Sequence, residues 1–145
     1  MGVVNMAKHI KEIHPQHVIC FKVGNFYNCY GKDAYIISYL FNYGVSNVEN
    51  NLVTSGFPKN ALSKNMARFE KEKLDYMVID TRNNYDVDYK IEHKNLNTYE
   101  KVFEVAHKYV NIKRRIEKIA DTLIKEKNLE KIRKIEKIAY EGRKV

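Results

Sequence analysis

The sequence predicts an α/β domain with a mixed β-sheet and covering helices, followed by a C-terminal helical extension. In the first part of the chain, runs of β-branched and aromatic residues are bounded by turn signals, and stretches with helical spacing of apolar residues separate these runs. Beyond that part only helical periodicity and dense charge remain. We therefore expect an α/β domain at residues 1–95 and a basic extension of two helices at residues 96–145.

The first 30 residues predict a short helix and two strands. Residues 5–14 form the helix, which ends where His14 precedes Pro15, because the residue before a proline disfavours helical geometry. Residues 17–23 are β-branched and aromatic and predict a strand. Gly24 and Asn25 predict a turn, and residues 26–30 a second strand.

The middle of the chain predicts two helices that alternate with strands. Apolar residues recur at helical spacing in residues 32–43, which predicts a helix on the sheet. A short strand at residues 52–55 is expected to end at the turn formed by Gly56, Phe57 and Pro58. A second helix follows at residues 60–73 with Asn60 as its cap, and residues 76–79 predict a further strand.

The last strand is predicted after a turn at Asn83 and Asn84, residues that tolerate positive φ angles. Val87, Tyr89 and Ile91 then alternate with charged side chains, so we expect a strand with one exposed face.

The C-terminal extension predicts two amphipathic helices. Asn97 followed by Glu100 is close to a capping box, and a narrow apolar stripe continues to Leu123. An interruption is expected at Lys127 and Asn128, before a second helix that ends near Gly142. Narrow stripes on charged helices predict that the two helices pack together, against the sheet or against another copy, so a homodimer through them is possible.

The positive charge is concentrated in the extension. The chain has 26 basic and 18 acidic side chains, a formal net charge of +8. Residues 1–89 have 10 basic and 9 acidic side chains, whereas residues 90–145 have 16 and 9, a net charge of +7. Such a segment attracts phosphate by counterion release. Lys113, Arg114 and Arg115 form the densest basic run, for which phosphate contact and a solvated helix face are both open interpretations.

The sequence gives no indication of a membrane span or a signal peptide, and we expect a cytoplasmic protein with no membrane partner. Cys20 and Cys29 lie in apolar stretches without metal or disulfide spacing, so buried free thiols are expected.

Several blocks in order resemble the mismatch-recognition domain of MutS proteins, MutS domain I. His14-Pro15, a strand ending at Val23 and the sequence Gly24-Asn25-Phe26-Tyr27-Asn28 are similar to its strand and Gly-x-Phe-Tyr-Glu motif. The similarity continues in four later segments, which are Lys32-Asp33-Ala34, Ser55-Gly56-Phe57-Pro58, residues 61–73 and residues 76–80. It covers about residues 6–80 and implies the domain I fold.

The resemblance implies a DNA-binding site at the motif, comprising Gly24, Phe26, Tyr27 and Asn28. In the family, the phenylalanine enters the minor groove as a wedge and stacks on a mispaired or unpaired base, while the glutamate hydrogen-bonds that base. Asn28 occupies the position of the glutamate, and its neutral amide can donate as well as accept. The family's basic Lys-Arg-Gly segment is replaced by residues 46–50, so we expect Lys113, Arg114 and Arg115 to supply phosphate contacts instead.

No nucleotide-binding Gly-x-x-x-x-Gly-Lys-Ser/Thr loop occurs in the sequence, and neither a cofactor nor catalysis is implied. An enzymatic alternative is a metal-dependent nuclease site at Asp80, Glu92 and Lys94. A zinc site is a further alternative, and it would use His14, His17 and Cys20.

The function predicted from the sequence is therefore non-catalytic binding of mispaired or distorted double-stranded DNA, with RNA left open as a target. The rival hypothesis is a protein-interaction module with a MutS-like domain that no longer recognises bases. Asn28 in place of glutamate and the missing basic segment favour this rival.

Overall fold

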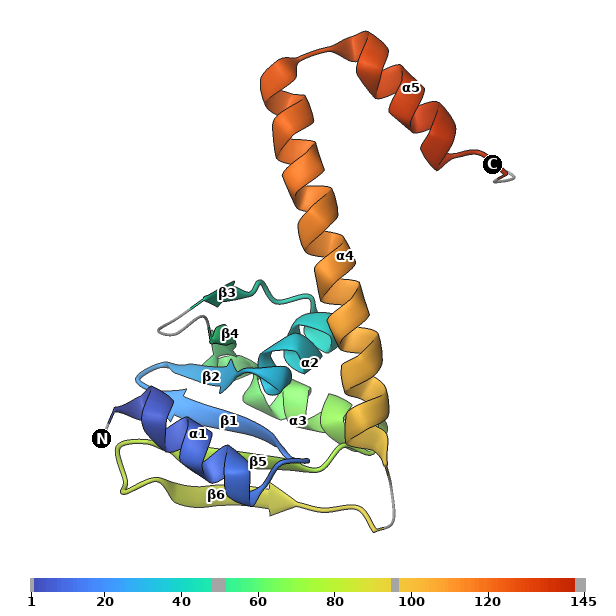
Figure 1. Cartoon of the computed structure of the whole chain (residues 1–145). Coiled ribbons are helices and arrows are strands. Elements are labelled where there is room, and N and C mark those ends of the chain that lie inside the picture. The colour runs from blue at the N-terminus through green and yellow to red at the C-terminus, as the bar shows by residue number, and fades with distance from the viewer. Residues whose placement is uncertain (1, 48–51, 95–96, 143–145) are drawn as a thin grey trace. The chain divides into compact units, whose positions relative to one another are not determined.

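A computed structural model describes residues 2–47, 52–94 and 97–142 (Figure 1). The chain divides into two compact units, Met1–Val110 and Asn111–Val145. The helices are α1 (Val3–Ile13), α2 (Lys32–Phe41), the 3₁₀ turn η2 (Lys59–Ala61), α3 (Leu62–Lys71), α4 (Thr98–Glu126) and α5 (Leu129–Ala139). The strands are β1 (Val18–Val23), β2 (Phe26–Tyr30), β3 (Ser46–Asn47), β4 (Val53–Pro58), β5 (Tyr76–Asp80) and β6 (Asp86–Ile91).

The strands of the first unit form one mixed sheet. Their order is β3-β4-β2-β1-β5-β6, in which β1 and β5 run parallel and every other pair is antiparallel. The parallel pair requires a crossover, and the chain from β2 to α3 lies between its two strands in sequence. This architecture confirms the predicted α/β fold class with a mixed sheet and covering helices.

The two faces of the sheet are covered by different helices (Figure 1). Val18 and Cys20 of β1 belong to the core beneath α2, α3 and the first turns of α4. Ile19 and Phe21, which alternate with them, belong to a second core beneath α1. From Val18 to Phe21, strand β1 is therefore buried on both sides, which explains why these four residues are all apolar.

The buried carboxylate of Asp33 connects four elements of the first unit. Located in the first turn of α2, it accepts hydrogen bonds from Lys11 Nζ at 2.8 Å, the Tyr99 hydroxyl at 2.6 Å and the Ile19 amide at 3.1 Å. Burial raises the pKa of Asp33, and the adjacent Lys11 ammonium opposes that rise. Since every partner donates, the ionised carboxylate fits this site.

Strand β4 is longer than the sequence indicated. The expected end at Ser55 is wrong, because the strand continues through Gly56 and Phe57 to Pro58 and pairs with β2 from Thr54 to Pro58. The two-residue strand β3 beside it was not predicted. The helix expected from Asn60 instead begins as η2, followed by α3 from Leu62, with no side-chain cap for either.

The edge strand β6 also differs from expectation. Its preceding turn has positive φ at Asn84, as predicted, but the second such residue is Tyr85 rather than Asn83. Val87 and Tyr89 are exposed, so the prediction of one buried face is wrong. Among the described strands, β6 pairs with β5 alone, and its charged side chains discourage pairing of this edge with other strands.

The first unit includes the beginning of α4. Tyr99, Ala106 and Val110 are buried, so the compact unit extends beyond residue 95, where the sequence analysis ended the α/β domain. Cys20 and Cys29 are buried free thiols with their sulfur atoms 3.5 Å apart, which confirms the expectation for both.

In the second unit, α4 ends at Glu126 and the chain turns at Lys127, which has a φ angle of 55°. Asn128 then caps α5 by accepting a hydrogen bond from the Lys131 amide at 3.1 Å. The predicted interruption is confirmed. Many apolar side chains of the stripes stay exposed, namely those of Ile112, Ile116, Ile119, Ile124, Leu129 and Ile138.

The two helices therefore do not pack on each other through these side chains, contrary to part of the expectation. Among the described helices, none has the length and apolar character needed to cross a lipid bilayer.

The fold predicts a large effect of removing the Asp33 charge. Asp33→Asn leaves the Lys11 ammonium without its carboxylate and places an amide donor against other donors, so we expect a loss of about 3 kcal/mol in unfolding free energy. Tyr99→Phe removes one hydrogen bond and should cost about 2 kcal/mol. Chemical denaturation of the three proteins measures both values. Wild-type stability in Asp33→Asn would contradict the role given to this carboxylate.

Candidate nucleic-acid interface

The tip of the β1–β2 hairpin is fixed by a tight turn. Val23 pairs with Phe26, so only Gly24 and Asn25 form the loop. Gly24 has a φ angle of 62°, and two-residue hairpin turns with positive φ at the first loop position favour glycine there. The start of η2 is hydrogen-bonded to this loop, because the Lys59 amide donates to the Asn25 carbonyl at 2.9 Å. The backbone around Phe26 is thus held from both sides.

Phe26 and Tyr27 lie on opposite faces of β2, as successive strand residues must. The Phe26 side chain is 54% exposed. Tyr27 is only 5% exposed, and its ring stacks on Phe57 with centroids 5.5 Å apart. Core packing therefore holds the Tyr27 side chain inside the protein, so the predicted DNA contact of this residue would come from its backbone. Its position anchors the strand that presents Phe26.

Asn28 lies on the same face of β2 as Phe26 and is half-buried. It pairs with Gly56, where an added Cβ would lie 2.6 Å from Asn28 Oδ1 and 2.8 Å from the Tyr27 carbonyl oxygen. The Asn28 amide therefore occupies the space that the missing side chain of Gly56 leaves open. The nearby Asn28 amide opposes the rise that burial causes in the pKa of the Tyr30 phenol.

The basic run predicted to contact phosphate lies in the second unit. Lys113 and Arg114 are half-buried on α4, and Arg115 is exposed. The hairpin residues of the candidate site belong to the first unit.

The alternative sites from the sequence are not assembled. His14 and His17 contact each other edge to face, whereas Cys20 is buried against Cys29. Asp80 pairs with Asp86 at one end of the β5–β6 ladder, and Glu92 follows Ile91, which pairs with Tyr76 at the other end. Within residues 2–47, 52–94 and 97–142, no group of three or more acidic, histidine or cysteine side chains is placed to hold a metal ion.

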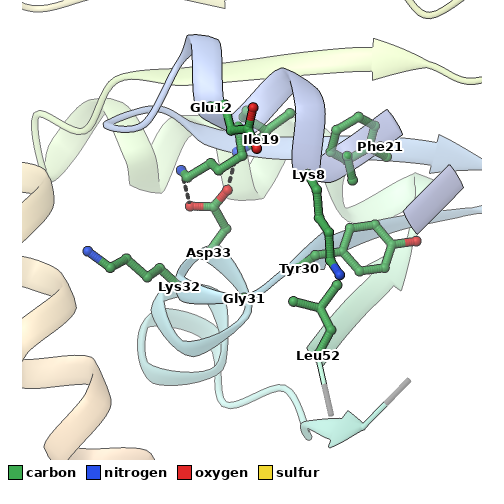
Figure 2. Close-up of a pocket in the computed structure, with 11 residues that line it drawn as sticks. Lys8, Glu12, Ile19, Phe21, Tyr30, Gly31, Lys32, Asp33 and Leu52 are labelled. Atoms are coloured by element: carbon green, nitrogen blue, oxygen red, sulfur yellow. Dashed lines mark hydrogen bonds and ion pairs between the residues drawn. The ribbon is translucent and has the colours of Figure 1, made fainter. Parts of the chain in front are cut away.

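Sequence reasoning missed a pocket on the α1 face of the sheet (Figure 2). It has a volume of about 370 Å³ and is lined by residues of α1, β1, β2 and the start of α2, together with Leu52. Tyr30 belongs to it and lies on the same side of β2 as Phe26 and Asn28. Alternation along β2 could have indicated that shared face, but the pocket depends on α1, which is distant in sequence.

Comparison with known families agrees with this geometry. Residues 2–122 match the family MutS domain I. The chain belongs to the MutS domain I family. The match confirms the resemblance drawn from residues 6–80 and extends it into α4. Membership indicates a DNA-binding domain of the mismatch-recognition type. Among curated proteins, no significant match to this chain was found.

The contact between Gly56 and Asn28 predicts a sensitive position. In Gly56→Ala, the new Cβ meets backbone at Tyr27 as well as the Asn28 amide, so the β2–β4 pair must separate. We expect a loss of about 1 to 3 kcal/mol in unfolding free energy. Gly44→Ala is the matched control, since nothing lies within 4 Å of a Cβ there. Equal stability of the two variants in thermal denaturation would contradict the tight packing at Gly56.

Proposed function

We propose that this domain binds double-stranded DNA and inserts the Phe26 ring at a mispaired or distorted base step, without catalysis. The observation that supports this function best is an aromatic side chain, 54% exposed, on a hairpin whose backbone is fixed at both ends. Unstacking a base step costs a few kcal/mol, and the cost is smaller where pairing is already defective. Stacking on an aromatic ring returns about 1 to 3 kcal/mol per base.

Asn28 has the role of contacting the edge of the displaced base in this proposal. Its amide is neutral and offers both a donor and an acceptor, whereas the family's glutamate only accepts. Replacing a carboxylate removes repulsion from DNA phosphates, but it also removes a charge-assisted hydrogen bond to the base. We therefore infer that affinity for any duplex rises and that discrimination of mispaired bases falls, relative to a domain with glutamate.

The basic extension supplies phosphate contacts in the same proposal. Lys113, Arg114 and Arg115 belong to the part of the chain that has a net charge of +7. Such contacts add affinity that depends on salt and not on base sequence.

The proposal predicts that Phe26→Ala weakens binding to bulged or mismatched duplex by about 1 to 3 kcal/mol, because base stacking is lost. Binding to a perfect duplex should change much less. Fluorescence anisotropy at physiological salt, with duplexes of equal length, measures the difference. Tyr89→Ala is the matched control, since Tyr89 is 48% exposed on the edge strand β6 of the same unit. Retention of the mismatch preference by Phe26→Ala would refute the wedge.

The extension has its own prediction. Replacing Lys113, Arg114 and Arg115 by glutamine should weaken binding to all duplexes alike and reduce the salt dependence by up to about 3 in the logarithmic slope. The control replaces Lys131, Arg133 and Lys134 of α5, which removes the same charge from the same unit. An equal loss in both triple variants would show that residues 113–115 act only through net charge.

A second candidate function is a protein-interaction module. Exposed apolar side chains along α4 and α5, including Ile116 and Ile138, favour it. Such a module would show no preference for defective duplex and no response to Phe26→Ala, and its molecular mass in solution would exceed that of one chain.

A further inference from the structure

The pocket on the α1 face has the size and surface of a small-molecule site. Its volume of about 370 Å³ falls in the range of roughly 300 to 1,000 Å³ found for ligand pockets. Its surface is mostly apolar, with contributions from Ala7, Ile19, Phe21 and Leu52. The rings of Phe21 and Tyr30 lie 5.9 Å apart and inclined at 54°. A flat aromatic ligand would find both aliphatic and aromatic contacts there.

Three lysines border the pocket, and two of them have partners inside the protein. Lys11 is bound to Asp33 and to the carbonyl of His17. Lys32 pairs with Glu100 at 3.5 Å and lies over the ring of Phe103.

The third, Lys8, is exposed, and it makes no ion pair with any acid in the described part of the chain. Figure 2 shows its side chain extending from α1 toward the part of the pocket that Tyr30 and Leu52 line. A cation at this place can pair with an anionic group at the pocket entrance.

The pocket and Phe26 lie on one face of β2. Phe26, Asn28 and Tyr30 alternate along the strand and therefore face the same side of the sheet. Four residues of strand correspond to about 13 Å, so Phe26 and the pocket are separated by roughly four base-pair rises. Phe26 and the pocket therefore share the face of the sheet that α1 covers.

We propose that the pocket binds a nucleobase together with its phosphate, the base against Tyr30 and Leu52 and the phosphate against Lys8. The nucleotide could come from two sources. For one of them, an everted nucleotide of bound DNA, the inference rests on the proposed function. A free nucleoside monophosphate is the other source and offers the same chemistry. Eversion costs a few kcal/mol and least for an unpaired base, so bulged duplexes are the best DNA ligands for this pocket.

The test uses two probes on the whole chain. Adenosine monophosphate is titrated and followed by the NMR shifts of the Tyr30 and Leu52 amides. A duplex with a bulged 2-aminopurine is titrated in parallel, since the fluorescence of this base reports its removal from the stack. The variants are Lys8→Glu and Tyr30→Leu, with Lys101→Glu as the matched control, because Lys101 is an exposed helical lysine of the same unit outside the pocket.

We expect Lys8→Glu to weaken adenosine monophosphate binding about tenfold through loss of the charge-assisted contact. Tyr30→Leu should weaken it to a similar degree, and Lys101→Glu should leave it unchanged. Binding of the mononucleotide without a 2-aminopurine signal supports the pocket with the free nucleotide as its ligand. A 2-aminopurine signal that Lys8→Glu abolishes supports the everted nucleotide. Folded wild-type protein that gives neither response, or variants that respond like wild type, would overturn the proposal.

The result of the pocket test can be distinguished from the result of the test of the proposed function. Phe26→Ala removes the wedge but leaves the pocket intact, so mononucleotide binding should persist in this variant. Loss of the mismatch preference in Phe26→Ala, together with an unresponsive pocket, retains the wedge and rejects the pocket. If the pocket binds the mononucleotide but the wild-type chain shows no preference for defective duplex, the pocket is retained and the wedge is rejected.

Discussion

The arrangement of the first unit depends on one buried carboxylate. Asp33 brings together the side chain of Lys11 from α1, the backbone of β1 and the hydroxyl of Tyr99 from α4. An ionised group without partners in this position would be strongly destabilising, so the three donors are a condition for the fold and not an addition to it. Because α1 is fixed at Lys11, the α1 face of the sheet and the pocket beneath it have a defined geometry.

A second constraint is the two-residue period of strand β2. It places Tyr27 in the core against Phe57 and Phe26 outside, from adjacent positions. A shift of one residue in the β1–β2 register would bury the exposed ring and expose the stacked one, and the loop at Gly24 excludes that shift by fixing the turn at two residues. The same period gives Asn28 its place over Gly56, so presentation of the site and stability of the sheet have a common cause.

What the sequence could predict follows the range of the interactions involved. Strands β1, β2 and β5, the helices and the interruption at Lys127 depend on local patterns, and they were predicted with errors of a few residues. The extension of β4 through Gly56, the exposure of Val87 and the burial that carries the first unit to Val110 depend on partners distant in sequence. The same division applies to the site. Gly24 and Phe26 follow from a local motif, whereas the burial of Tyr27 and the pocket at Tyr30 require the assembled sheet and α1.

The distribution of charge separates two aspects of the proposed function. Residues 1–89, which include Phe26, have a net charge of only +1, so the hairpin itself attracts phosphate weakly. Stacking and base contact are therefore short-range and can distinguish a defective step from a sound one, but they do not bring the protein to DNA. In the proposed function, residues 90–145 with their net charge of +7 have that role, and they do not distinguish sequences. Added salt weakens the phosphate contacts and leaves stacking largely intact, so the fraction of binding energy that depends on mispairing rises with ionic strength. Discrimination measured only at low salt would thus underestimate the contribution of Phe26.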